Sequence, residues 1–151
     1  MKKINPLYLT ATVASGASFE TCIENVDIGG PSMLRSSAKN HAYITIATSP
    51  SQYDLLIEEM KSNDGCSLLE TRKKLAYAAF NLSAAYDSTI ANYFASKVNN
   101  TENNVQSRTY KPQVLLKYGC NPHQKPAGIY SIFGDKMPFK VINGTPGKLL
   151  F

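Results

Sequence analysis

The sequence predicts an α/β protein, because helical patterns and strand patterns follow one another along the chain. Residues 68–98 are dense in Ala and Leu, with apolar side chains every three or four positions, as in one long buried helix. Residues 42–48 and the short apolar runs after residue 113 are rich in β-forming residues and bounded by turn residues, which is typical of strands. Residues 99–113 are polar, lack periodicity and end near a proline, so we predict a linker between two domains.

The chain before residue 49 is predicted to contain two helices and a strand. Residues 4–15 begin with turn-forming residues and continue as an apolar run rich in β-formers, so we predict a strand end or a loop there. Residues 18–24 predict a short helix with a serine N-cap. The Gly-Gly pair at residues 29–30 predicts a tight turn, and Pro31 fits the first position of the helix that follows it. Residues 42–48 then predict a strand.

Two capping boxes predict the next helices. Residues 49–52 have the first pattern, with a proline at the first helical position, and apolar side chains at helical spacing follow as far as Met60. Residues 63–65, Asn-Asp-Gly, predict the end of that helix. Ser67 and Glu70 form the second pattern, which predicts the start of the long helix. The apolar stripe of the long helix is expected to be core or a subunit contact, and its members are Leu75, Ala79, Leu82, Tyr86, Ile90, Tyr93 and Phe94.

Residues 27–39 combine the features of an anion-binding site. Two glycines let a ligand approach the backbone closely, and the first turn of a helix has free N–H groups and the positive end of the helix dipole. Asp27 lies beside this turn, while Arg35 and Lys39 are four residues apart and share one face of the helix. The alternative is ordinary structure, since a Gly-Gly pair before a helix is common and an Arg/Lys pair at this spacing is usually a solvated face.

Composition argues against several classes of protein. The chain has no apolar stretch of the roughly 20 residues that cross a membrane and no secretion signal, so we expect a cytoplasmic protein without membrane contact. Its three cysteines, Cys22, Cys66 and Cys120, are far apart and lack metal-ligand spacing, so we expect no disulfide framework and no bound metal. The formal charge of +5 is concentrated after residue 109, but the lysines there are scattered and arginine is absent, so we expect no nucleic-acid partner.

Four separate blocks of the sequence, in order, resemble the bifunctional purine-biosynthesis enzyme family, which fuses IMP cyclohydrolase to AICAR transformylase. The first block is Asp-Ile-Gly-Gly at residues 27–30, with Arg35 and residues 39–41, Lys-Asn-His, behind it. The resemblance covers nearly the whole chain, and its other blocks are residues 40–45 leading to Tyr53, residues 67–72 with 79–80 and 85–87, and residues 116–124, with residues 141–144 and 146–147 also similar.

The resemblance implies a fold and a division into domains. Residues 1–98 would be the C-terminal part of the IMP cyclohydrolase domain, a methylglyoxal-synthase-like domain with a parallel sheet and a long helix. Residues 99–113 would be the linker, and residues 114–151 would begin the transformylase domain, an α/β domain similar to cytidine deaminase. The strand-like runs of this last part are residues 114–118, 129–133 and 139–142.

The resemblance also implies two reactions that lead to IMP, carried out by a homodimer. In the first, 10-formyltetrahydrofolate gives its formyl group to AICAR ribonucleotide, and in the second the formylated product is cyclised to IMP. By the same resemblance, Lys39 matches a catalytic lysine with a proton-transfer or polarising role. The substrate contacts would be Asn5, Asp27, Ile28, Gly29 and Gly30 in the cyclohydrolase part, and Lys117 and Tyr118 in the transformylase part.

Members of this family are several hundred residues long, so the chain resembles an internal piece of one. The family's phosphate-binding loop lies before the matching segments, and its transformylase Lys-His pair lies after them. We therefore expect the chain to be incomplete and inactive alone, and the alternative is a non-catalytic nucleotide-binding or dimerisation fragment. Neither histidine is expected to act as a base, because His41 is expected at a helix end or in the core and His123 in a turn.

Overall fold

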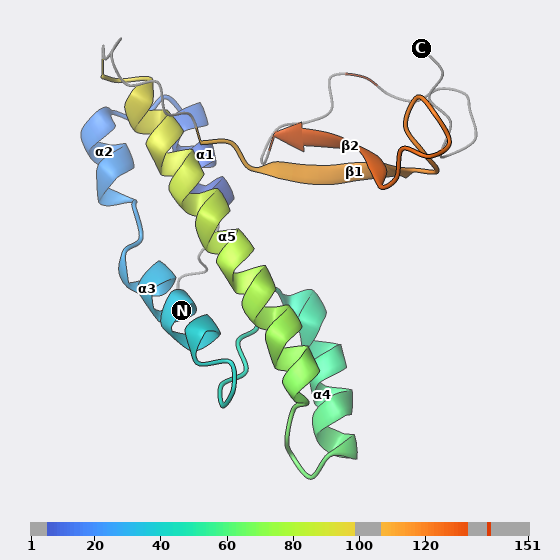
Figure 1. Ribbon diagram of the computed structural model, residues 1–151. Coiled ribbons are helices and arrows are strands. Elements are labelled where there is room, and N and C mark those ends of the chain that lie inside the picture. The colour runs from blue at the N-terminus through green and yellow to red at the C-terminus, as the bar shows by residue number, and fades with distance from the viewer. Residues whose placement is uncertain (1–5, 99–106, 133–138, 140–151) are drawn as a thin grey trace. The chain divides into compact units, whose positions relative to one another are not determined.

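A computed structural model of the chain describes residues 6–98, 107–132 and 139. The chain divides into two compact units, residues 1–103 (unit 1) and residues 104–151 (unit 2), and each unit is described by itself. Unit 1 is helical in its described part, whereas unit 2 contains a two-stranded sheet (Figure 1).

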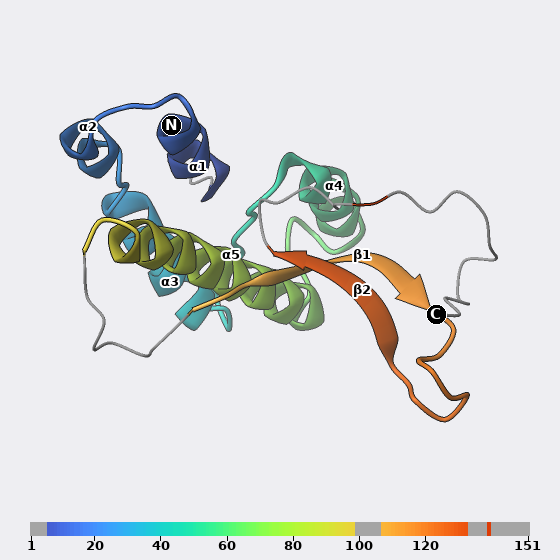
Figure 2. The same cartoon turned by 90° about the horizontal axis from the view of Figure 1, so that it is seen from above.

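Unit 1 is arranged around one long helix, α5 (Leu69–Ala95). Its other elements are α1 (Pro6–Ala14), α2 (Phe19–Glu24), α3 (Gly29–Lys39), the short 3-10 helix η1 (Pro50–Gln52) and α4 (Tyr53–Ser62). α1 and α2 lie together near the C-terminal end of α5, and α3 runs beside its middle (Figures 1 and 2). None of the described helices combines the length and the apolar composition that crossing a bilayer requires.

The prediction of a strand or loop at residues 4–15 is wrong for residues 6–14, which form α1. Pro6 is the first residue of this helix, a position at which its missing N–H costs nothing. Leu9 is 1% exposed and packs with Cys22 of α2 and Tyr93 of α5 in an apolar cluster. This packing stabilises the helix in spite of the β-forming residues in its sequence, since tertiary contacts routinely override local propensity.

The short helix predicted at residues 18–24 is confirmed as α2, and the Ser18 side chain accepts a hydrogen bond from the Thr21 N–H at 3.2 Å. The predicted helix after it begins two residues early, because Gly29 and Gly30 are the first residues of α3 and Pro31 is the third. Pro31 is tolerated there since the first-turn N–H groups have no partner within the helix. α3 buries one face, Pro31, Leu34 and Ala38, and packs it on α5.

The predicted strand at residues 42–48 is wrong, because residues 44–48 have no regular secondary structure. A strand needs a neighbouring strand for its backbone hydrogen bonds, and no described residue of unit 1 supplies one. Other contacts hold the segment: the Thr45 and Ser67 hydroxyls share a hydrogen bond of 2.6 Å, and Ile46 packs against the cluster between α3 and α5.

The capping box at residues 49–52 is confirmed. The Ser49 N–H donates to Gln52 Oε1 at 3.1 Å, and Ser49 Oγ accepts from the Ser51 N–H at 3.3 Å. The predicted end of the helix is confirmed as well, since Asp64 and Gly65 have φ angles of 49° and 80°, in the left-handed region that ends helices.

The second predicted capping box, at Ser67, is wrong. α5 begins at Leu69 with Leu68 as its N-cap, and Glu59 of α4 supplies the capping carboxylate. Glu59 Oε2 accepts from the Leu68 N–H at 3.0 Å, and Oε1 accepts from the Thr71 hydroxyl at 2.5 Å. Glu59, nine residues before the N-cap Leu68, therefore accepts the N–H that the third helical residue accepts in a local capping box.

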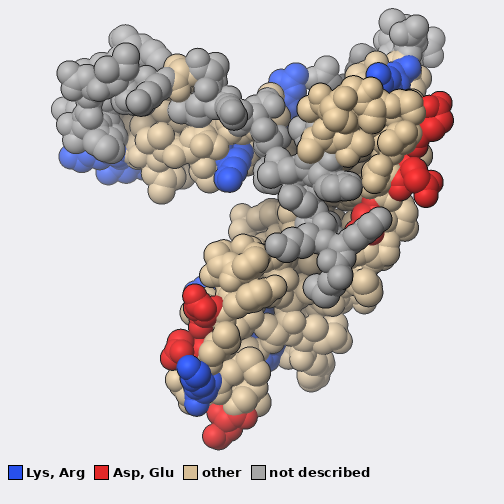
Figure 3. Space-filling view, turned by 180° about the vertical axis from the view of Figure 1, so that it is seen from behind, with Lys and Arg blue, Asp and Glu red and all other residues tan. Residues whose placement is uncertain are grey.

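The predicted apolar stripe of α5 is largely confirmed as core, although the helix ends at Ala95, slightly before the predicted Val98. Leu75, Ala79, Tyr86 and Tyr93 are buried, whereas Phe94 is exposed. Charged side chains of both signs gather at the end of unit 1 that carries α4 and the start of α5 (Figure 3). There Lys61 pairs with Glu58 at 2.9 Å and Lys73 with Glu70 at 2.8 Å, all well exposed.

Unit 2 contains an antiparallel pair of strands, β1 (Tyr110–Leu116) and β2 (Ala127–Ile132), with an irregularity between Pro112 and Val114. The strands predicted at residues 114–118 and 129–133 are thus confirmed for residues 114–116 and 129–132. The predicted linker is wrong at residues 110–113, which belong to β1, and its residues 99–106 lie outside the described residues. The predicted strand at 139–142 lies outside them too, apart from residue 139.

Candidate functional site

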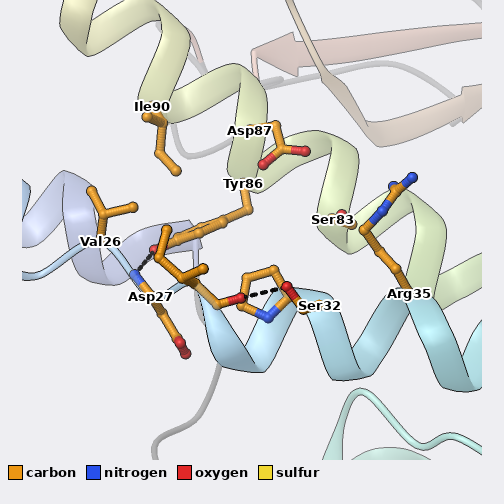
Figure 4. A pocket seen from close by; sticks show the side chains of 10 residues that line it. Val26, Asp27, Ser32, Arg35, Ser83, Tyr86, Asp87 and Ile90 are labelled. Atoms are coloured by element: carbon orange, nitrogen blue, oxygen red, sulfur yellow. Dashed lines mark hydrogen bonds between the residues drawn. The ribbon is translucent and has the colours of Figure 1, made fainter.

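A pocket of about 220 Å³ lies between the start of α3 and the middle of α5. Val26, Pro31 and Ile90 give it apolar walls, and the polar side chains of Ser32, Arg35 and Asp87 also line it (Figure 4). The segment predicted to bind an anion therefore borders a cavity with one cationic side chain.

Asp27 is fixed at this pocket by two hydrogen bonds, one in which it is the donor and one in which it is the acceptor. Its backbone N–H donates to the Tyr86 hydroxyl at 2.7 Å, and its carboxylate Oδ1 accepts from the Gly30 N–H at 3.0 Å. Tyr86 is 3% exposed, whereas the Asp27 carboxylate points away from it (Figure 4). One of the amides expected to bind a ligand anion thus already has a carboxylate partner, which also suits the positive end of the α3 dipole.

The two glycines do not form the predicted tight turn. Both are helical, and neither appears among the residues with positive φ. A Cβ atom built on Gly29 would meet nothing within 4 Å, so the backbone here is open to approach from outside. Ile28, directly before the glycines, is 72% exposed and leaves an apolar side chain at the same edge.

Arg35 and Lys39 are both exposed, but only Arg35 lines the pocket. The Arg35 guanidinium lies 5.7 Å from the centre of the Phe80 ring, a cation–π arrangement between α3 and α5. Lys39 is the last residue of α3, and at 1.5 Å per residue it lies about 15 Å along the helix from Gly29. The structure thus brings Asp27, Ile28 and Arg35 together and places Lys39 at the opposite end of α3.

Arg72 of α5 and His41 of the turn after α3 hold the end of α3 near Lys39. Arg72 donates through Nε to the His41 carbonyl at 2.9 Å and through Nη2 to the Ala42 carbonyl at 3.0 Å. Its Nη1 donates to the Ser67 carbonyl. His41 Nδ1 lies 3.1 Å from the Ala38 carbonyl, so the expectation of a helix-end histidine is confirmed.

Sequence reasoning missed the roles of Tyr86 and Arg72 in this region. Tyr86 belongs to the apolar stripe and to a block that resembles the family, and the signal for its role is that a buried tyrosine hydroxyl usually needs a hydrogen-bond partner. Arg72 ends a block that resembles the family, but nothing in that block points to its partners, which lie about thirty residues earlier in the chain.

In unit 2, Lys117 and Tyr118 follow β1 directly, at the start of the connection to β2. Lys117 is exposed and Tyr118 half-buried. The Gly119 N–H donates to the Gln124 carbonyl at 2.9 Å, and a Cβ on Gly119 would lie 2.9 Å from Gln124 Oε1. These contacts fold the connection back just beyond the two predicted contact residues.

The other residues considered in the sequence analysis add no functional group to these sites in the described part of the chain. Asn5 lies outside the described residues. Within residues 6–98, 107–132 and 139, no three His, Cys, Asp or Glu side chains come together as metal ligands. Cys22 is buried, Cys66 and Cys120 are exposed, and all three are free thiols.

A family model described as the AICARFT/IMPCHase bienzyme matches residues 37–150. The chain belongs to this family. The match contains Lys39, Lys117 and Tyr118, and it begins after Asp27. The resemblance drawn from the sequence blocks is therefore confirmed.

Individual members of the AICARFT/IMPCHase family are similar over most of the chain. The bifunctional purine biosynthesis protein PurH of Parvibaculum lavamentivorans is 39% identical over 89% of this chain and 25% of its own length. PurH of Brucella anthropi is 43% identical over 82% of this chain and 22% of its own length. PurH of Bartonella henselae is 44% identical over 77% of this chain and 22% of its own length. A solved structure titled as the crystal structure of ForH has a TM-score of 0.47 and 37% identity, over 52% of this chain and 41% of that one. The chain spans about a quarter of the length of the curated relatives it matches.

Proposed function

We propose that the chain is part of a bifunctional enzyme of purine biosynthesis, with unit 1 in an IMP cyclohydrolase site and unit 2 in an AICAR transformylase domain. The observation that carries the proposal is the family match over residues 37–150, which takes in Lys39 at the end of α3 and Lys117 with Tyr118 after β1. In this proposal residues 1–98 belong to a methylglyoxal-synthase-like domain, residues 99–113 to a linker, and residues 114–151 to the start of a cytidine-deaminase-like domain of a cytoplasmic homodimer.

The cyclohydrolase reaction joins the carboxamide nitrogen of the formylated AICAR ribonucleotide to its formyl carbon. The formyl oxygen leaves as water, so two protons must move from nitrogen to oxygen. Such a ring closure depends on holding the substrate in its folded form and on polarising the formyl oxygen. In our proposal the Lys39 ammonium polarises that oxygen or donates a proton to it, and Asp27, Ile28 and the two glycines contact the nucleotide, with Asn5 as a further contact.

The geometry of α3 constrains how one nucleotide would meet these groups. Lys39 and Gly29 are about 15 Å apart along the helix, so a ligand that contacts both ends must lie along α3. The open backbone at Gly29 and the cationic Arg35 between the two ends support this placement.

In unit 2, we propose that Lys117 and Tyr118 grip AICAR ribonucleotide and that 10-formyltetrahydrofolate is the formyl donor. The exposure of Lys117 at the start of a tightly folded connection supports a role in binding an anionic ligand. A lysine provides a point charge for a phosphate, where an arginine would provide a bidentate contact.

A second candidate is a non-catalytic nucleotide-binding or dimerisation fragment. The observation that favours it is one apolar face of α4, on which Tyr53, Ile57 and Met60 are 50%, 49% and 43% exposed. Large exposed apolar side chains that lie close together often mark an interaction surface.

Ligand binding to the 151-residue chain tests the main proposal. IMP bound only to the folded state must raise the unfolding midpoint, and we expect such a rise at millimolar IMP. Lys39→Ala should weaken IMP binding about tenfold or more, whereas Lys61→Ala, which removes an exposed lysine of α4, should not change it. An equal affinity of both variants for IMP would refute the role of Lys39. IMP formation by the same sample would contradict the expectation that the chain is inactive alone.

A further inference from the structure

We propose that Arg72 is a positioning residue for Lys39, which holds the end of α3 so that the Lys39 ammonium is presented at a fixed place. This inference rests on the proposed function of Lys39. Arg72 itself touches no ligand in this proposal, and it acts through the backbone that follows Lys39.

The contacts of Arg72 are made to consecutive peptide groups. Its Nε donates to the His41 carbonyl at 2.9 Å and its Nη2 to the Ala42 carbonyl at 3.0 Å, two and three residues after Lys39. The guanidinium is a rigid planar fork with five N–H donors, so it fixes the direction of both carbonyls at once. Its Nη1 donates to Ser67, which ties the same group to the segment before α5.

The backbone around Lys39 is held on both sides, while the side chain is free. Directly before it, Ala38 is 0% exposed and packs with Ala76 and Ala79 of α5. After it, in the turn that follows α3, the His41 and Ala42 carbonyls accept hydrogen bonds from Arg72. Lys39 itself is exposed. This arrangement fixes the Lys39 backbone and leaves its ammonium in the solvent, where a ligand can reach it.

Arg72 lies on a rigid support. It is the fourth residue of α5 and is half-buried, and the start of α5 is capped by Glu59 of α4. A guanidinium on a fixed helix can hold the turn at residues 40–44, in which the Tyr43 and Ile44 N–H groups donate to the Asn40 carbonyl. Loss of Arg72 should therefore loosen this turn and leave the rest of α5 in place.

A double-mutant cycle on IMP affinity in the 151-residue chain tests the inference. Arg72→Lys keeps the positive charge and loses the fork, and we expect it to weaken IMP binding about tenfold. In a chain that already carries Lys39→Ala, the same substitution should change the affinity less than about twofold, because there is no ammonium left to position. Lys73→Gln, on the next residue of α5 and in an exposed pair, is the matched control and should leave binding unchanged.

Three outcomes of this cycle are distinct. If Lys39→Ala binds IMP as well as the parent chain, the proposed function fails and takes the inference with it. If Lys39→Ala weakens binding but Arg72→Lys costs the same factor in both backgrounds, the inference alone fails, since Arg72 then acts by a route other than Lys39. If the cost of Arg72→Lys disappears without Lys39, the binding data support the inference.

Amide hydrogen exchange gives a readout that needs no ligand. In Arg72→Lys, the amides of Tyr43 and Ile44 should exchange faster by about tenfold, and amides in the middle of α5 should not change. Unchanged exchange at residues 43 and 44 would overturn the inference whatever the binding data show. If Arg72→Lys does not fold, Arg72→Gln, which keeps a neutral donor amide, takes its place in both measurements.

Discussion

The hydrogen bond from the Asp27 N–H to the Tyr86 hydroxyl links the candidate site to the core of unit 1, and Tyr86→Phe removes it. The bond is 2.7 Å long and joins residues 59 positions apart. Tyr86 is 3% exposed, so its ring is expected to stay in place in the variant and the change is confined to one oxygen atom. The pocket walls made by Val26 and Ile90 are untouched.

The size of the effect follows from what the Asp27 N–H loses. A neutral hydrogen bond contributes about 0.5–1.5 kcal/mol net, and a buried donor left without a partner costs about 1–3 kcal/mol. Asp27 is half-buried, so water reaches its N–H in part and the lower end applies. We expect Tyr86→Phe to lower the free energy of unfolding by about 1 kcal/mol.

Urea unfolding followed by circular dichroism at the helix band measures this change, with the slope against urea expected to stay constant. Tyr77→Phe is the matched control, because Tyr77 lies on the same helix and is 70% exposed. We expect the control to unfold like the parent chain. A Tyr86→Phe variant as stable as Tyr77→Phe would show that the bond contributes nothing, and the argument that α5 holds the Asp27 segment would fail.

Two further predictions concern the ends of α5. Glu59→Ala removes the carboxylate that caps the start of α5 and should lower the free energy of unfolding by about 1 kcal/mol. The control is Glu58→Ala, which changes an exposed side chain of the same helix and should leave the free energy of unfolding unchanged. Equal urea midpoints for the two variants would contradict a capping role for Glu59. At the other end, a hydrogen bond with the Cys22 side chain, followed by burial, raises the pKa of Tyr93 to about 12. Since the folded pKa is raised above the unfolded value near 10, the stability from Tyr93 is complete below pH 10 and is lost as the pH rises toward 12. Absorbance titration at the tyrosinate band should show a step near pH 12 that is absent in Tyr93→Phe, and identical curves for the parent chain and the variant at that pH would contradict it.

The sequence predicted those elements whose signals are local. The capping box at residues 49–52 is satisfied within its own four residues, and the stop at Asp64 and Gly65 depends only on the φ angles of those residues. The same pattern at Ser67 failed because its hydroxyl bonds to Thr45 and Arg72 instead. A capping motif therefore predicts a helix start only where no distant side chain competes for the serine.

The failures at residues 4–15 and 42–48 share a physical cause. Both segments are rich in β-forming residues, but the described part of unit 1 has no strand to pair with them. Strand formation depends on a partner, whereas a helix satisfies its own backbone hydrogen bonds. Residues 6–14 therefore form a helix around Leu9, and residues 44–48 are held by side chains.

The candidate site was predictable only in its local part. Asp27 and Gly30 are three residues apart, and a carboxylate before a helix start is a recognisable signal. Tyr86 and Arg72 meet their partners across 59 and about 30 residues, so no spacing rule identifies them. Only the packing of α3 on α5 makes these contacts, and that packing follows from the combined burial of both helices.

The two anchors of α3 also explain why the predicted effects on its ends are separable. Tyr86 holds the Asp27 segment and Arg72 holds the His41 segment. Fourteen residues separate Asp27 from His41, and fourteen residues of α5 separate Arg72 from Tyr86. The interval on α5 is helical throughout and spans about 21 Å, whereas α3 accounts for about 15 Å of the other and the residues flanking it supply the rest. Because α5 is a single unbroken helix, the distance between the anchors is fixed by its own backbone hydrogen bonds. Loss of one anchor therefore frees one end of α3 while the other end stays held, and Tyr86 governs the Asp27 end as Arg72 governs the Lys39 end.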